Sequence, residues 1–307
     1  MTETSAHEPE STGGAGFKRI SRASHIKELI LQNIFLLCAL IAVMGVALIF
    51  VFVGVRGWPI FGEVGLGKFL GGLTWHPTAG EFGVLPLIAG SLVVTVGAMI
   101  IGAPLAIGTA VFLSEVASRR MRSIVRPAVE LLAGVPSVVY GFFGLMILRP
   151  VIAKMTGGLG FGPLTACLIL GIMIVPTIST LTEDALGSIP GGIREASYAM
   201  GATTWQTIYK VMLPAAKLGI IDAIILGMGR AIGETMAVLM VVGNAPVFYQ
   251  GPGKPMSTLT SQIVMDMPYA TGEHRTALFG MAIILFLFSM ALVGGVRILS
   301  RVKERTA

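Results

Sequence analysis

An arginine and a glutamate lie four positions apart inside an otherwise apolar stretch, at Arg230 and Glu234. If residues 218–242 form one helix, Arg230 lies about 18 Å from its start and Glu234 shares its face. A guanidinium is costly at that depth of a bilayer, so it should face a partner or a water-filled path. Its forked donors suit an anion. Glu234 could accept a hydrogen bond from a protonated anion oxygen, which hydrogen phosphate offers and fully ionised sulfate does not.

A structural role for the same two residues is the alternative. Arg230 and Glu234 could form a buried ion pair, or pair with other helices, and so define the packing. Gly227, Gly229 and Gly233 surround the arginine and would let another helix or another subunit approach closely. The two roles do not exclude each other, and we expect Arg230 and Glu234 to line a substrate path.

A second group of polar residues lies between two apolar runs, in residues 183–217. Gly201 supplies the backbone freedom that a helix end needs, and Thr203 with Gln206 fits a capping box. We therefore expect two short helices with Gly201 between them, too small to fold without support. After Gly201, helical spacing predicts one shared face for Trp205, Ile208, Val211 and Met212.

The elements that must position these residues are membrane-spanning helices. Apolar residues make up 54% of the chain, charged residues only 12%, and the mean hydropathy is +0.84. This composition is typical of an all-α polytopic membrane protein. About 20 apolar residues cross a bilayer as a helix, and six runs of that kind are present, at residues 29–55, 82–114, 131–148, 161–182, 218–242 and 276–296.

Lysine and arginine predict the orientation of these helices. They gather before the first run, after the second, within residues 183–217 and after the sixth, so these segments and both termini are predicted to be cytoplasmic. The expected organisation is a cytoplasmic tail at residues 1–28, a first transmembrane helix at 29–55 and a membrane domain of five helices at 82–300. Residues 1–17 are rich in Ser, Glu and Gly and are expected to be disordered.

Several kinds of function are excluded. The four histidines and two cysteines lie at no metal-ligand spacing, and no hydrolytic or redox constellation appears, so an enzyme is not predicted. Residues 62–69 have the glycines and lysine of a phosphate-binding loop, but Phe69 stands where Ser or Thr would hold Mg²⁺. The net charge of +6 is explained by topology, so no nucleic-acid partner is predicted.

Three prolines interrupt the predicted helices, at Pro104, Pro136 and Pro176. Each removes a helical hydrogen bond, which is tolerated in a membrane where protein or a cavity covers the released carbonyl. Tyr140 near Pro136, Thr177 beside Pro176 and Ser137 can satisfy such groups. They could equally line a polar path.

The polar segment 183–217 carries a family resemblance. Glu195, Ala196 and Ser197, then Gly201, then Val211, Leu213 and Pro214 have the spacing of the EAA loop of binding-protein-dependent ABC importers. That loop has Glu-Ala-Ala, three residues, Gly, nine residues and Ile-x-Leu-Pro. Here Ser197 replaces an alanine and Val211 an isoleucine. In that family the loop contacts a separate ATPase, a role that the resemblance implies for these seven residues.

Other stretches resemble the permeases of the high-affinity phosphate importer. They are residues 112–115, 134–141 and 229–235, and the continuation at 236–238 is similar to the PstC-type subunit. The resemblance covers about residues 29–300 and implies the type I importer permease fold, also called MetI-like. It assigns the substrate path to Arg230 and Glu234.

The resemblance also implies the partners. A PstA-type second permease would complete the path, a PstB-type ATPase dimer would bind ATP and Mg²⁺, and a PstS-type extracytoplasmic protein would deliver phosphate. This chain would itself bind no cofactor. Lipid surrounds it, and a phosphate-sensing kinase system is a further candidate partner. The rival functions are transport of a related oxyanion, secondary transport, and a phosphate-sensing membrane scaffold without transport.

Overall fold

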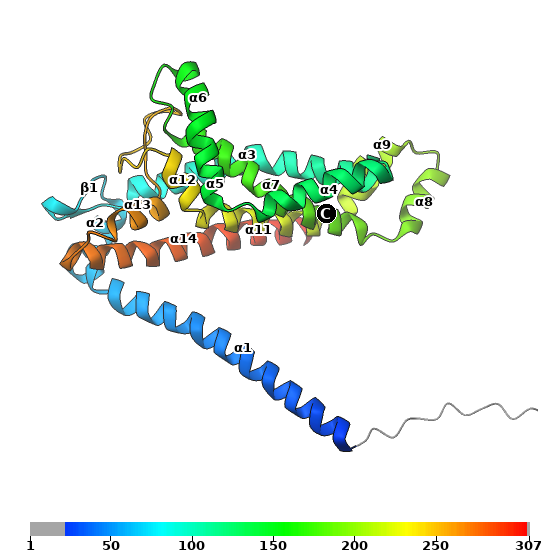
Figure 1. Ribbon diagram of the computed structural model, residues 1–307, viewed down its shortest axis with the longest axis horizontal. Helices are drawn as coiled ribbons and strands as arrows, with labels where there is room; N and C mark the ends of the chain where they lie inside the picture. The colour runs from blue at the N-terminus through cyan, green and yellow to red at the C-terminus, as the bar shows by residue number, and fades with distance from the viewer. Residues whose placement is uncertain (1–21, 306–307) are drawn as a thin grey trace, which may run out of the picture. The chain divides into compact units, whose positions relative to one another are not determined.

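The computed structural model describes residues 22–305 and, within them, the side chains of residues 28–298 (Figure 1). The chain divides into two units, Met1–Phe52 and Val53–Ala307. The described part of the first unit is a single helix that forms most of α1 (Arg22–Gly57) and contains nearly all of the predicted run 29–55. The predicted disorder of residues 1–17 concerns residues outside the described part.

Long apolar helices make up most of the second unit. Within residues 22–305, five helical stretches, α1 among them, are long and apolar enough to cross a bilayer. A sixth crossing arises if α11 and the short helices before it, which meet at 70°, count as one. These agree with the six predicted runs. The spans of the second unit are α3 (Leu85–Val111) with η3 (Phe112–Val116), α5 (Ser137–Phe143) with η4 (Gly144–Leu148) and α6 (Arg149–Thr156), α7 (Pro163–Gly187), α11 (Lys217–Gly233) and α14 (Gly272–Arg305).

Two of the predicted runs are broken in the structure. The run 218–242 is not one helix, because α11 ends at Gly233 and a separate short helix, α12 (Met236–Val241), follows. The run 131–148 is also divided, because α4 (Arg119–Gly134) ends before Pro136 and α5 begins after it. Pro136 has no backbone N–H and favours an extended residue before it, and Val135 is extended, with φ −69° and ψ 127°.

The core of the second unit lies between α3, α7, α11 and α12. Glycines bring α3 and α7 together. A Cβ on Gly97 would lie 2.4 Å from the Cys167 sulfur, and one on Gly102 would lie 2.6 Å from the Gly171 carbonyl oxygen. Small residues at such contacts let membrane helices approach closely and gain van der Waals energy. The central pair of helices is therefore tightly packed.

Shorter elements lie at the two ends of this unit, with the β hairpin at one end and α8 and α9 at the other (Figure 1). A second apolar cluster, which includes Phe69, Trp75, Leu259 and Met281, forms the core of the end that carries the β hairpin. The short elements at this end are η1 (Phe61–Gly65), α2 (Leu66–Gly71), β1 (Trp75–His76), η2 (Pro77–Ala79), β2 (Glu81–Phe82) and α13 (Leu259–Asp266). β1 and β2 are antiparallel, with Trp75 opposite Phe82. The other end holds α8 (Gly191–Ala199), α9 (Thr204–Thr207), η5 (Ile208–Met212) and α10 (Leu213–Ala215).

Candidate functional site

Arg230 lies in the last turn of α11 and reaches across to α7. Its Nη1 donates a hydrogen bond to the Thr177 hydroxyl oxygen at 2.9 Å, and both side chains are half-buried. Thr177 directly follows Pro176, and it is one of the polar residues beside a proline that the sequence allows either to satisfy a released carbonyl or to line a polar path. The guanidinium thus has an acceptor on a neighbouring helix, which agrees with the expectation that it avoids lipid.

Glu234 occupies a different place from the predicted one. The chain leaves the helix at this residue, whose backbone is extended with φ −68° and ψ 126°. One carboxylate oxygen, Oε1, accepts a hydrogen bond from the Ala237 amide at 3.1 Å and so satisfies the start of α12. The prediction that Glu234 shares a helical face with Arg230 is therefore wrong. No ion pair joins the two side chains in the part of the chain that the structure describes.

A small cavity adjoins Glu234, and four of its nine lining residues carry hydroxyl groups. Thr260 of α13 contributes one of these hydroxyls, which donates a hydrogen bond to the Glu234 carbonyl oxygen at 3.2 Å. The polar lining comes from Ser91, Thr95, Thr258 and Thr260, with Val94, Ala231, Ile232 and Val238 as apolar neighbours. Sequence reasoning missed these hydroxyls, because single Ser and Thr residues are common in membrane helices. The run of hydroxyl residues at 257–261 is the signal that could have indicated them.

The second broken helix lies against the first. α5 packs on α12, and a Cβ on Gly141 would lie 3.0 Å from the Ala237 Cα atom. The Tyr140 hydroxyl donates to the Leu132 carbonyl at 2.8 Å, which is the carbonyl that Pro136 leaves without its helical partner. The prediction that Tyr140 can satisfy such a group is confirmed. The Leu132 carbonyl released at Pro136 is thus satisfied by a side chain, as a bilayer requires, while Gly134 and Pro136 themselves are exposed.

The predicted pair of short helices is present in residues 183–217, and we call α8 to α10 the coupling hairpin. Gly201 follows α8 with a left-handed φ of +80°. Thr203 and Gln206 form the predicted capping box at the start of α9. Ser197 and Thr207 share a hydrogen bond of 2.9 Å between their hydroxyl oxygens, which joins the two arms. Of the other predicted coupling residues, Glu195, Ala196 and Pro214 are exposed, whereas Val211 and Leu213 are half-buried.

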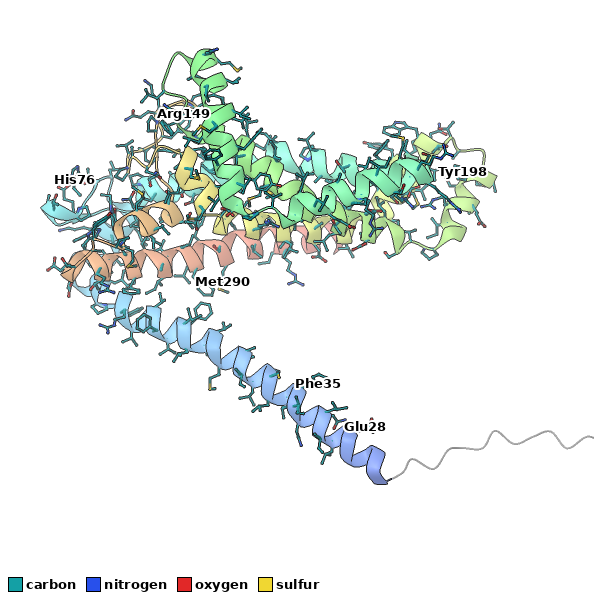
Figure 2. The ribbon with its side chains drawn as sticks, viewed as in Figure 1. Glu28, Phe35, His76, Arg149, Tyr198 and Met290 are labelled. Carbon is teal, nitrogen blue, oxygen red and sulfur yellow. The ribbon has the colours of Figure 1, made fainter. Side chains whose placement is uncertain are left out.

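One prediction for the hairpin is wrong. Trp205 does not share the buried face of Ile208 and Met212, which are 2% and 0% exposed, because its own side chain is 68% exposed. The π-helical turn η5 follows Thr207 and shifts the face that an α-helix would continue. Ile193, Tyr198, Met200 and Tyr209 of the hairpin are exposed as well, and Tyr198 lies at this end of the second unit (Figure 2).

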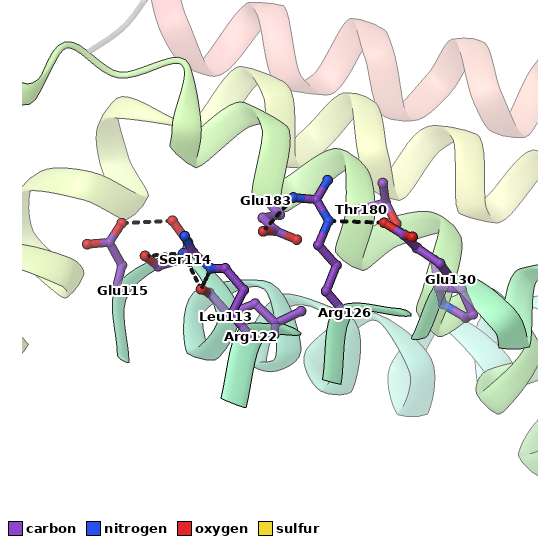
Figure 3. Close-up of polar contacts among 9 residues, drawn as sticks. Leu113, Ser114, Glu115, Arg122, Arg126, Glu130, Thr180 and Glu183 are labelled. Carbon is purple, nitrogen blue, oxygen red and sulfur yellow. Dashed lines mark hydrogen bonds and ion pairs between the residues drawn. The ribbon is translucent and has the colours of Figure 1, made fainter. Parts of the chain in front are cut away.

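Charged residues also join neighbouring elements of the second unit, and Figure 3 shows those of η3, α4 and α7. Arg194 Nη2 lies 2.6 Å from Glu115 Oε1, and Arg126 Nε lies 3.0 Å from Glu130 Oε1, the predicted i, i+4 pair. Arg126 also lies 3.6 Å from Glu183 of α7. The hydrogen bond to Glu130 raises the pKa of the Arg126 guanidinium above its ordinary value. Within the described residues, no cluster of three or more His, Cys, Asp or Glu is placed to hold a metal ion.

Comparison with known proteins identifies the family. Residues 98–304 match the binding-protein-dependent transport system inner membrane component. The probable ABC transporter permease YqgH of Bacillus subtilis is 42% identical over 86% of this chain and 87% of that protein. The phosphate transport system permease protein PstC of Pasteurella multocida is 34% identical over 90% of this chain and 92% of that protein.

Solved structures agree with this family. A bacterial ABC transporter that imports alginate has a chain that is 16% identical, with a TM-score of 0.63 over 90% of this chain and 98% of that one. The inward-facing MetNI methionine ABC transporter has a chain that is 25% identical, with a TM-score of 0.50 over 69% and 94%. The predicted MetI-like fold, the multi-pass organisation and the location in the cytoplasmic membrane are therefore confirmed. The chain belongs to the binding-protein-dependent transport system inner membrane component family, the permeases of ABC importers.

Proposed function

We propose that this chain forms half of the path by which an ABC importer carries inorganic phosphate across the cytoplasmic membrane. The observation that carries the proposal is Arg230, a guanidinium at a helix break within the membrane domain of a chain similar to PstC over nine-tenths of its length. Phosphate transport is in the names of several relatives that are 30–35% identical.

The chemistry of the site fits hydrogen phosphate. Arg230 uses one Nη1 donor for Thr177 and has further N–H groups that can bind two oxygens of one anion. Glu234 caps α12 with Oε1, and its second oxygen can accept a hydrogen bond. An anion that both accepts from Arg230 and donates to Glu234 must carry a proton. This requirement favours hydrogen phosphate over sulfate.

We infer that the path is completed by partners. A PstA-type permease supplies the other half, a PstB-type ATPase dimer holds ATP and Mg²⁺, and a PstS-type protein delivers phosphate from outside. This chain binds no cofactor of its own. Family membership supports an ATPase and a binding protein as partners and disfavours secondary transport. ATP closes the ATPase dimer, the coupling hairpin moves with it, and the membrane helices alternate between outward and inward access.

Replacement of the path arginine tests the proposal. Arg230→Gln should abolish phosphate uptake, because a neutral amide cannot offer a charged fork to the anion, while the ATPase still co-purifies. The measurement is uptake of labelled phosphate by proteoliposomes that contain the whole complex and the binding protein. Arg120→Gln, on an exposed arginine of α4, is the matched control and should retain normal uptake.

The same assay distinguishes the alternative substrates. In the wild-type complex, the phosphate-loaded binding protein should stimulate ATP hydrolysis. Sulfate should not replace phosphate in this stimulation. If a phosphonate is transported in preference to phosphate, the chain serves a related oxyanion instead. Normal uptake by Arg230→Gln would overturn the assignment of Arg230 to the path, whichever substrate is used.

A further inference from the structure

We propose that Arg194 and Glu115 form a latch through which the coupling hairpin moves α3, the helix that lines the Glu234 cavity. Arg194 Nη2 of α8 lies 2.6 Å from Glu115 Oε1 at the end of η3. The Glu115 side chain is only 5% exposed, whereas that of Arg194 is 36% exposed. Both are positioning residues in this proposal, since neither lies near the path.

The far arm of the coupling hairpin packs on the membrane helices through an apolar cluster that contains Met212, Leu186 of α7 and Val111 of α3, whereas α8 has few such contacts. No side chain of α8 is buried, and the Ser197 hydroxyl bonds to Thr207, within the hairpin itself. Among the described residues, Arg194–Glu115 is the one side-chain hydrogen bond or ion pair that joins α8 to a membrane-crossing helix. α8 otherwise contacts α9 and η5 within the hairpin and is connected through the chain to α7 before it. The ion pair therefore gives α8 itself a direct link to α3, in addition to the apolar cluster around Met212 that Val111 of α3 joins.

The end of η3 is fixed by several side-chain hydrogen bonds. The Ser114 hydroxyl donates to Glu115 Oε1 at 2.9 Å. Arg122 of α4 donates from Nε to the Leu113 carbonyl at 2.7 Å and from Nη2 to the Ser114 carbonyl at 2.8 Å (Figure 3). A guanidinium at the carbonyl end of a helix is also favourable for the helix dipole. The Glu115 carboxylate that pairs with Arg194 is thus fixed in position at the end of η3, the continuation of α3.

α3 extends from this latch to the Glu234 cavity. Thr95 lies twenty residues before Glu115, about 30 Å along a helix, and it lines the cavity beside Glu234 together with Ser91. α3 is the helix most closely packed on α7, with glycine contacts along their crossing. Because tightly packed helices shift as rigid bodies rather than deform, a displacement at Glu115 moves the cavity wall. This step rests on the proposed function, since it takes the cavity to be part of the path.

The test uses the complete complex in proteoliposomes with its binding protein. The variants are Glu115→Gln, Arg194→Gln and the exchanged pair Glu115→Arg with Arg194→Glu. Each single variant should still assemble with the ATPase but lose at least about tenfold in ATP hydrolysis stimulated by loaded binding protein, and transport fewer substrate ions per ATP. The exchanged pair should recover half or more of the stimulation. Glu130→Gln is the matched control, because it removes a carboxylate that also pairs with an arginine but is 54% exposed.

The outcomes separate this proposal from the proposed function. If wild-type complex transports no phosphate, the proposed function fails, and the latch is then judged with whatever substrate stimulates the ATPase. Wild-type stimulation and wild-type transport per ATP in both single variants would overturn the latch. So would loss of assembly in both variants, which would assign the pair to ATPase docking, or an assembled exchanged pair with no recovery.

Discussion

At the scale of single residues, the arrangement around Arg230 depends on one hydroxyl. The guanidinium is half-buried, and Thr177 supplies a side-chain acceptor at 2.9 Å. A hydrogen bond to a charged group typically contributes about 1.5–3 kcal/mol, enough to hold the arginine in one direction. We therefore regard Thr177 as the residue that aims Arg230, whereas Glu234 is held separately by the start of α12.

Removal of that hydroxyl gives a prediction at this scale. Thr177→Val keeps the shape of the side chain but leaves Arg230 without its acceptor, so the KM for phosphate should rise about tenfold, the factor for ~1.4 kcal/mol. The measurement is initial uptake rate against phosphate concentration. Thr180→Val is the control, because the Thr180 hydroxyl donates only to the Pro176 carbonyl of its own helix. Equal KM values for both variants would contradict the role of Thr177.

At the scale of elements, short helices joined at defined angles carry the candidate function. The coupling hairpin turns at Gly201, whose φ of +80° suits glycine, and a Cβ there would meet no atom within 4 Å. A substitution at this position therefore tests backbone conformation without a steric clash. The left-handed region costs other residues about 1–2 kcal/mol.

Gly201→Ala is predicted to weaken ATPase binding about tenfold, because the hairpin then favours other conformations. Titration of the ATPase onto purified permease measures this directly. Gly192→Ala is the matched control, since Gly192 also has open space around it but lies in α8 with no positive φ. Gly201→Asn should bind nearly as well as wild type, because asparagine tolerates this conformation. Normal binding by Gly201→Ala would show that the hairpin does not need this turn.

At the scale of the whole molecule, the second unit has two ends with different chemistry. One end carries the coupling hairpin, with Arg194, Lys210 and the exposed Trp205. The positive-inside rule assigns this end to the cytoplasm. The opposite end carries the β hairpin and the loop at Tyr269. A permease of an ABC importer needs this polarity, because the ATPase and the binding protein approach from opposite sides.

Thiol labelling provides the corresponding prediction. Met200→Cys and Tyr269→Cys would place thiols at side chains that are 87% and 86% exposed. In a Cys38→Ser background, with Cys167 buried, a membrane-impermeant maleimide should label position 269 in intact cells and position 200 only in inverted vesicles. Labelling of both positions from the same side would overturn the assigned orientation.

The sequence by itself determined the features that depend on neighbouring residues. Hydrophobic runs define the spans because each helix must satisfy its own backbone in lipid, and lysine and arginine indicate the orientation. The turn at Gly201 and the capping box of Thr203 with Gln206 are confirmed because both need only residues within one turn. The break at Pro136 has a local chemical cause as well.

Only the tertiary structure decided how distant segments meet. No proline marks the end of α11 at Gly233, and the run 218–242 is apolar enough, despite Arg230 and Glu234, to be predicted as one helix. The contact of Arg230 with Thr177 joins residues that are 53 positions apart. The cavity beside Glu234 is lined by residues from several different helices. Such contacts depend on how α3, α7 and α11 pack, and packing is a property of facing surfaces that a single run of residues does not contain.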